Sequence, residues 1–167
     1  MPHPSLGLPP LDTTRGQPAA ARRLRTSRER LARIALENAV RLTPRLSEAY
    51  GEEGLRRFLR DYERHIEQLA KALETGSDYY VVNYAEWLVP VYRRREVPMK
   101  DLMALLEGLH DAAATVLTPS ENELADELFA RWNERLQHHR RLPGDHPGNP
   151  VVRFFWKGAG ILDDEVV

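Results

Sequence analysis

A histidine and an aspartate four residues apart carry the clearest chemical signal in this sequence. Asp61 and His65 belong to a segment whose apolar residues recur at helical spacing, so the two side chains share one face of a helix. His65 falls on the apolar stripe itself, where its ring nitrogens need polar partners. Tyr62, Tyr84 and Glu86 are the polar groups that lie close enough in the sequence pattern to supply them.

Two hypotheses follow for His65. In the simpler one, it is a core histidine whose ring nitrogens are satisfied by these neighbours. In the other, it contacts a ligand or acts as a pH-sensitive switch, because histidine titrates near neutrality. No nucleophile and no second acid stand beside it, so we predict no catalytic residues. The candidate ligand-binding residues are Asp61, Tyr62, His65, Tyr84, Glu86 and Trp87.

A single Glu-x-x-His pair is the other candidate site. Glu107 and His110 have the spacing found in carboxylate-bridged di-iron proteins, which use two such pairs and two further glutamates. The second pair is missing, so a di-iron oxidase is only a lesser alternative, and we predict no metal site. His138 and His139 are expected to place basic groups near a negative helix end. Neither a glycine-rich phosphate-binding loop nor a Gly-x-Ser-x-Gly motif is present, and no cofactor is predicted.

Amphipathic helices must position these side chains. Apolar residues that recur at three, four and seven predict helices over 20–42, 52–74, 78–95, 98–115 and 119–139. Thr43-Pro44 interrupts the first helix, which we expect to bend and resume to Tyr50. Gly76 ends the second helix, and the run from Thr118 to Glu121 is a strong start signal for the last.

Pro90 lies inside the third predicted helix, in the stretch NYAEWLVPVYRRREVP that runs from Asn83 to Pro98. Apolar residues cover most of the girth of this helix, which is typical of a central position. Proline has no N–H, and its ring presses against the carbonyl of Glu86, so we expect a bend. The bend either curves the helix around a core or serves as a functional hinge.

These elements predict an all-α fold. It consists of an antiparallel four-helix bundle core with an additional N-terminal helix and an irregular aromatic C-terminal tail. Residues 1–19, with five prolines, are expected to be a flexible arm, 20–142 the helical bundle domain, and 143–167 a Pro/Gly-rich loop and tail. Phe154, Phe155 and Trp156 in the tail either cover the bundle or bind a partner.

Composition and charge narrow the functional classes. The chain has 167 residues, 42% hydrophobic and 29% charged, as expected for a globular protein. Without cysteine it has no disulfide and no thiolate site, which favours the cytoplasm. The net charge of -1 gives no overall attraction to nucleic acid, and no apolar run approaches the ~20 residues that span a bilayer. The first residues lack the pattern of a secretory signal. We interpret the arginines between Arg15 and Arg45 as a solvated basic face.

Three motifs across residues 50 to 140 resemble the helical domains that precede cobalamin-binding domains in bacterial regulators. A histidine is followed by xxLAxAL, then by YxxWL, and then by VPxxxLxxLLExL. In that family a Rossmann-like domain with an Asp-x-His-x-x-Gly motif follows, but GDHPGN does not have this spacing. The family also has a capping motif, a tryptophan followed some ten residues later by Glu-His, and no Glu-His dipeptide is present here. The resemblance therefore implies a stand-alone bundle of the sensory or regulatory type. Its residues here are His65, Leu69, Ala70, Ala72, Leu73, Tyr84, Trp87, Leu88, Val97, Pro98, Leu102, Leu105, Leu106, Glu107 and Leu109.

Together these observations predict a non-enzymatic bacterial regulatory or sensory module that acts through protein–protein contacts. The partner is another protein or a second copy, bound through the first helix or the aromatic tail. No nucleic-acid or membrane partner is expected. The alternative is a bundle that holds a small ligand or pigment near His65, Tyr84 and Trp87, beside the Pro90 bend.

Overall fold

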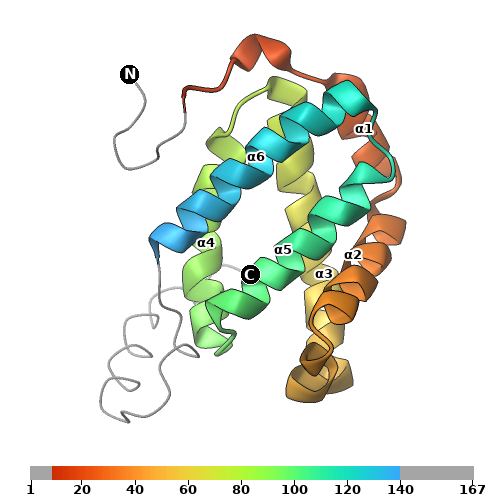
Figure 1. Ribbon diagram of the computed structural model, residues 1–167, viewed down its shortest axis with the longest axis vertical. Helices are drawn as coiled ribbons and strands as arrows, with labels where there is room; N and C mark the ends of the chain where they lie inside the picture. Colours follow the sequence, from red (N-terminus) through yellow and green to blue (C-terminus); the bar gives the residue numbers. More distant parts are fainter. Residues whose placement is uncertain (1–8, 140–167) are drawn as a thin grey trace.

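The computed structural model describes residues 9–139, which form a short 3₁₀ helix and six α-helices with no strand in that range. The all-α prediction is confirmed (Figure 1). The predicted segments 78–95, 98–115 and 119–139 each match a helix to within one residue at either end. The predicted tail, with Phe154, Phe155 and Trp156, lies outside the described residues. The elements are η1 (Thr13–Arg15), α1 (Pro18–Thr26), α2 (Arg28–Leu42), α3 (Arg45–Thr75), α4 (Tyr79–Arg94), α5 (Met99–Ala114) and α6 (Pro119–His138).

The first predicted helix is in fact two helices that meet at Ser27. The backbone angles of Ser27, φ −96° and ψ 8°, turn the chain. As a result α1 packs on α3, while α2 packs mainly on α5. Leu24 and Leu31 are both fully buried, and they keep heptad spacing across the break. Because the apolar stripe continues through Ser27, the sequence pattern did not reveal the turn.

The boundary at the start of the second predicted helix is confirmed. Thr43-Pro44 interrupts the chain, a short helical segment begins at Arg45, and Gly51 then adopts φ 60° and ψ −174°. Only glycine takes this conformation at little cost, so Gly51 separates the short segment from the long helix that follows. At the other end, Gly76 with φ 64° terminates α3. Thr118 forms the predicted capping box at the start of α6.

The described part of the predicted N-terminal arm is folded onto α3. Asp12 caps η1, and the Gln17 N–H donates a 2.6 Å hydrogen bond to the carbonyl of Leu73. A Cβ atom at Gly16 would lie 2.6 Å from the carbonyl oxygen of Glu74. Backbone partners at the end of α3 thus fix this proline-rich segment, which its composition alone suggests is flexible.

The long helix α3 is the element around which the others are arranged. It packs against α1, α2, α4, α5 and α6, while α4 pairs with α6 and α2 with α5 (Figure 1). The helix predicted to be central, α4, instead lies between α3 and α6, and Trp87 at its middle is 37% exposed. Contact with two neighbours accounts for the wide apolar girth of α4.

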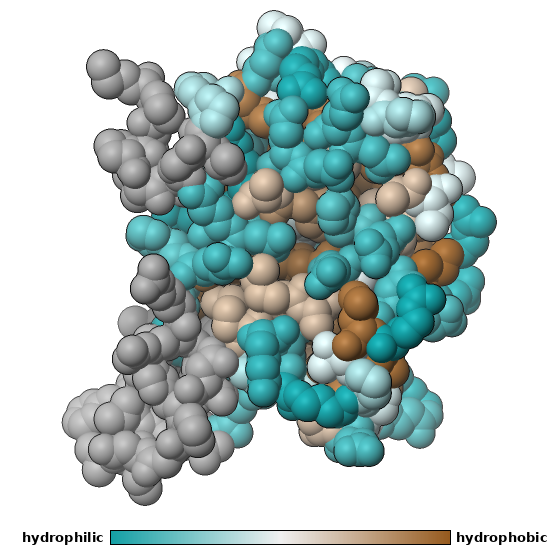
Figure 2. All heavy atoms as spheres, viewed as in Figure 1, coloured by the Kyte–Doolittle hydropathy of each residue, from teal (hydrophilic) through white to brown (hydrophobic). Residues whose placement is uncertain are grey.

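The core confirms the predicted placement of His65, which is 1% exposed. The largest fully buried side chains are aromatic: Trp132, Tyr62, Tyr92 and Phe129. Figure 2 shows that hydrophilic residues cover much of one face, with apolar residues exposed near its middle. Within residues 9–139, no helix combines the length and apolar character needed to cross a membrane.

Candidate functional site

Three helices position a cluster of aromatic and polar groups around His65. The His65 Nδ1 lies 2.9 Å from the hydroxyl of Tyr84, and Nε2 lies 3.3 Å from the hydroxyl of Tyr92, both on α4. The ring of Trp132, on α6, packs edge-on against His65 with centroids 5.9 Å apart. Tyr84 was a predicted partner of His65, whereas Tyr92 and Trp132 were not among the predicted site residues.

The hydrogen-bond pattern assigns a direction to each proton in this cluster. The hydroxyl of Tyr92 donates to Oδ2 of Asp61 over 3.3 Å, so its oxygen can only accept from His65. Nε2 of His65 therefore carries the proton, and Nδ1 accepts a hydrogen bond from the hydroxyl of Tyr84. Arg95 completes the chain by donating from Nη1 to the same Asp61 oxygen. A continuous polar chain thus runs from Tyr84 in the core to Arg95 at the surface.

His65 is held neutral by its surroundings. Burial, with the positive charges of Arg95 and Arg64, lowers the pKa of His65 to about 3. Burial and the Asp61 carboxylate also raise the pKa values of the Tyr84 and Tyr92 hydroxyls. This environment disfavours the charged imidazole near neutral pH. Both ring nitrogens have hydrogen-bond partners, as the simpler hypothesis expects, and the hypothesis of a ligand contact or a switch stays a prediction.

The remaining predicted ligand residues do not all converge on His65. The Tyr62 hydroxyl donates 2.7 Å to the carbonyl of Leu105, although its ring contacts His65. Glu86 lies on another side of α4 and pairs with Arg135 and His139 on or just after α6. Asp61 takes part through Tyr92, as described above, and Trp87 stacks on Tyr84 with ring centroids 5.3 Å apart.

A groove between α3 and α4 opens to solvent at the outer end of this series of hydrogen bonds, where Asp61 and Arg95 line it. Its volume is about 370 Å3, and its walls carry five arginines but only one carboxylate, that of Asp61. Trp87 and Val91 add an apolar surface. The lining residues are Arg57, Arg60, Asp61, Arg64, Trp87, Val91, Arg94 and Arg95.

Helix geometry explains why the arginines gather. Arg57, Arg60 and Arg64 recur at three and four on the exposed side of α3, and so lie on one face. Arg94 and Arg95, at the end of α4, face them across the groove. From the sequence alone the α3 arginines resemble an ordinary solvated face. The triple arginine after Val91-Tyr92 was the signal that could have marked the site.

Part of the positive charge in this groove has no carboxylate partner among residues 9–139. Arg95 pairs with Asp61, and Arg57 pairs with Glu53 one turn away. Arg64 instead lies over the ring of Trp87, 5.9 Å from its centroid. Neither Arg60 nor Arg64 forms an ion pair with any carboxylate of residues 9–139. Guanidinium groups beside an exposed indole provide charged hydrogen-bond donors and a flat apolar face, which suit a carboxylate-bearing ligand with apolar parts.

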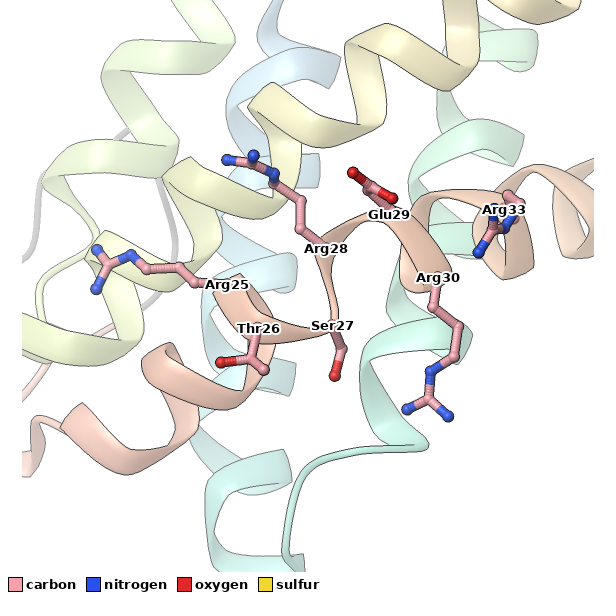
Figure 3. Close-up of a pocket in the computed structure, with 7 residues that line it drawn as sticks. All are labelled: Arg25, Thr26, Ser27, Arg28, Glu29, Arg30 and Arg33. Carbon is pink, nitrogen blue, oxygen red and sulfur yellow. The ribbon is translucent and has the colours of Figure 1, made fainter.

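A second group of arginines, at the α1–α2 junction, does not form a comparable site. Figure 3 shows that the side chains around this pocket point away from one another rather than into a shared space. Arg25 is held by Glu67 and Glu74, and Arg28 lies 3.9 Å from Glu63, all on α3. These arginines attach the N-terminal helices to α3.

The Glu-x-x-His pair has a structural environment of its own. His110 lies 2.6 Å from Asp126 of α6, and its ring packs on Phe129. Glu107 is exposed. In the part of the chain that the structure describes, no three His, Asp or Glu side chains are grouped closely enough to hold a metal ion.

Comparison with known proteins gives no relative from which a role could be carried over. No family model, no curated protein and no solved structure matches the chain. The resemblance to helical domains of cobalamin-dependent regulators therefore stays a prediction, and the function of the groove is argued from its own geometry.

Proposed function

We propose that this chain is a cytoplasmic regulatory module, without catalytic activity of its own, that binds an acidic segment of a partner protein in the α3–α4 groove. The single observation that carries the proposal is the cluster of five arginines around one carboxylate, beside a partly exposed tryptophan. Such a cluster is costly to hold together unless anions compensate it, because like charges repel.

A peptide fits the groove better than the other anionic ligands. The groove is open, and Trp87 and Val91 line it together with the arginines, so side chains of both kinds have a place to bind. Arginine and tryptophan are also the residues most enriched among those that dominate protein–protein binding. The net charge of -1 gives the chain no general attraction to nucleic acid.

The polar chain beneath the groove supports its shape. Asp61 fixes Arg95 and is itself fixed by Tyr92 and, through it, by His65. A guanidinium that is already oriented loses less conformational entropy when a carboxylate binds. His65 therefore contributes to binding as a positioning residue and not as a ligand.

The test uses a fluorescein-labelled ten-residue peptide in which Asp-Asp pairs alternate with leucine. Its fluorescence anisotropy reports binding to the full chain at about 0.15 M ionic strength, where charges more than about 8 Å apart are largely screened. The Arg60→Glu/Arg64→Glu variant reverses the two charges that lack carboxylate partners within residues 9–139. We expect its dissociation constant to rise at least about tenfold, as for charge pairs at interfaces.

The matched control is Arg30→Glu/Arg33→Glu, which makes the same change in net charge on exposed residues of α2. We expect it to change the dissociation constant by less than about twofold, since it lies outside the groove. Equal losses in the two variants would show that only overall charge matters. Tighter binding of a single-stranded oligonucleotide of the same charge would also contradict the proposal.

The alternative, a small ligand or pigment near His65, has one observation in its favour. Trp132 is fully buried, yet its Nε1 has no hydrogen-bond partner among residues 9–139. A buried donor of this kind usually finds an acceptor. The absorption spectrum and native mass spectrum of freshly purified protein test this alternative: a bound chromophore or an excess mass supports it, and a colourless, ligand-free protein counts against it.

A further inference from the structure

The chain itself contains an acidic segment that matches the groove. Residues 161–167, ILDDEVV, place Asp163, Asp164 and Glu165 in a row between apolar residues. The groove offers the complementary pattern, with arginines beside Trp87 and Val91. The preceding residues 140–160 carry basic groups, including Arg153 and Lys157, and a single carboxylate, Asp145, so consecutive acidic residues occur in this tail only at 163–165.

The described chain ends beside α4, one of the two helices that form the groove. His139, the last described residue, lies 2.8 Å from Glu86, which directly precedes Trp87 on α4. From there to Asp163 there are 24 residues. A random coil of 24 residues would have a root-mean-square span of about 27 Å, which exceeds the ~10–12 Å diameter of a helix, so this length is sufficient to reach the other side of α4.

From this complementarity we infer that residues 161–167 dock in the α3–α4 groove of their own chain and compete there with the acidic partner. The inference rests on the proposed function, since the same arginines would serve both ligands. Asp163, Asp164 and Glu165 take the place of the partner's carboxylates, and the flanking apolar side chains cover Trp87 and Val91. The segment is thus an autoinhibitory element, which an acidic partner must displace.

Tethering makes a weak contact effective. A segment on a short flexible linker experiences an effective concentration in the millimolar range. If its intrinsic dissociation constant is about 100 μM, an external peptide that uses the same groove would bind roughly tenfold more weakly to the intact chain than to one with a disabled segment.

The experiment measures this competition in the full chain. A fluorescein-labelled peptide with the sequence GAGILDDEVV is titrated with the wild-type chain and with the Asp163→Asn/Asp164→Asn/Glu165→Gln variant. We expect the variant to bind the peptide about tenfold more tightly, because its groove is free. Asp145→Asn, which neutralises an acidic residue outside the segment, is the control and should match the wild type.

The outcomes separate this inference from the proposed function. If the variant and the wild type bind the peptide equally, and Arg60→Glu/Arg64→Glu still weakens binding, the groove is a peptide site but autoinhibition is overturned. If the arginine variant binds as well as the wild type, the groove is not the site, and both proposals fail.

A second measurement detects the docked segment without any peptide. The chain has no cysteine, so a nitroxide label on Val167→Cys is site-specific. We expect it to broaden the indole N–H resonance of Trp87, and Arg60→Glu/Arg64→Glu should restore that signal. A Trp87 signal that does not change when the nitroxide is reduced would overturn the inference, as would broadening found only between differently labelled chains in a mixture.

Discussion

At the residue scale, the hydrogen bonds of His65 require an uncharged imidazole ring. His65 accepts a hydrogen bond from Tyr84 and donates one to Tyr92, and this arrangement exists only for the neutral ring. A protonated ring would have two donors and would face Arg95 and Arg64, whose charges already disfavour it. The donor and acceptor roles in the hydrogen bonds that connect Tyr84, His65, Tyr92 and Asp61 therefore depend on the protonation state of the His65 ring.

This dependence predicts a loss of stability in mild acid. The pKa of His65 is about 3 in the folded chain and about 6.5 when unfolded, so the unfolded state binds the extra proton first. The stabilisation from His65 is complete above pH 6.5 and is lost as the pH falls from 6.5 toward 3. Between pH 7 and pH 5 the loss is about 2 kcal/mol.

Urea unfolding of the wild type and of His65→Gln, followed by circular dichroism, measures this effect. The glutamine can hydrogen-bond but does not titrate, so the stability advantage of the wild type should shrink by about 2 kcal/mol from pH 7 to pH 5. From pH 7 to pH 9 the difference should stay constant, since histidine is neutral in both states. A difference that is independent of pH throughout would mean that His65 protonates in the folded chain.

At the scale of elements, α2 and α5 pack closely at Gly108. A Cβ atom there would lie 2.4 Å from the carbonyl oxygen of Ala35 and 2.8 Å from the backbone nitrogen of Ala39. The Gly108 carbonyl also accepts a hydrogen bond from Asn38. The two helices can approach this closely only because residue 108 has no side chain.

We therefore expect Gly108→Ala to destabilise the protein although alanine favours helix. The clash is with backbone atoms, which cannot rotate away, so the helices must separate at a cost of about 2 kcal/mol. Thermal unfolding of Glu107→Ala, at the exposed neighbouring position, provides the control and should differ from the wild type by less than about 0.5 kcal/mol. A Gly108→Ala protein as stable as the wild type would show that α2 and α5 are less closely packed than in this structure.

The elements were largely predictable from sequence, and the site only in part. Capping residues and breakers such as Gly76 and Thr118 act locally, so the pattern places the helix ends well. The turn at Ser27 escaped because the apolar stripe passes through it unchanged. Tyr84 could be predicted as a partner of His65 because it lies on the next helix of the bundle. The groove could not be predicted, because its shape depends on how the end of α4 packs against α3. No local pattern reports that packing.

At the scale of the whole molecule, the question is which surface mediates association. The first predicted helix was one candidate, but several of its apolar side chains, including Leu24 and Leu31, are fully buried, and its two halves pack on α3 and α5 of the same chain. The large apolar side chains exposed within residues 9–139 are Leu42, Tyr79 and Trp87, at the end of α2 and at two places along α4. They are too few to form a stable dimer interface. The aromatic run Phe154–Trp156 is then the remaining predicted association surface.

We expect self-association to depend on that run. Each aromatic side chain can bury roughly 150–250 Å2, so replacing Phe154, Phe155 and Trp156 with alanine should raise the dissociation constant of a dimer more than about a hundredfold. Sedimentation velocity over a range of concentrations would then show a dimer for the wild type and a monomer for the triple variant. Leu42→Ala, which removes an exposed apolar side chain from α2, is the control and should sediment like the wild type. Equal masses for the wild type and the triple variant at every concentration would exclude the aromatic run as a dimer interface, leaving the groove as the only proposed binding surface.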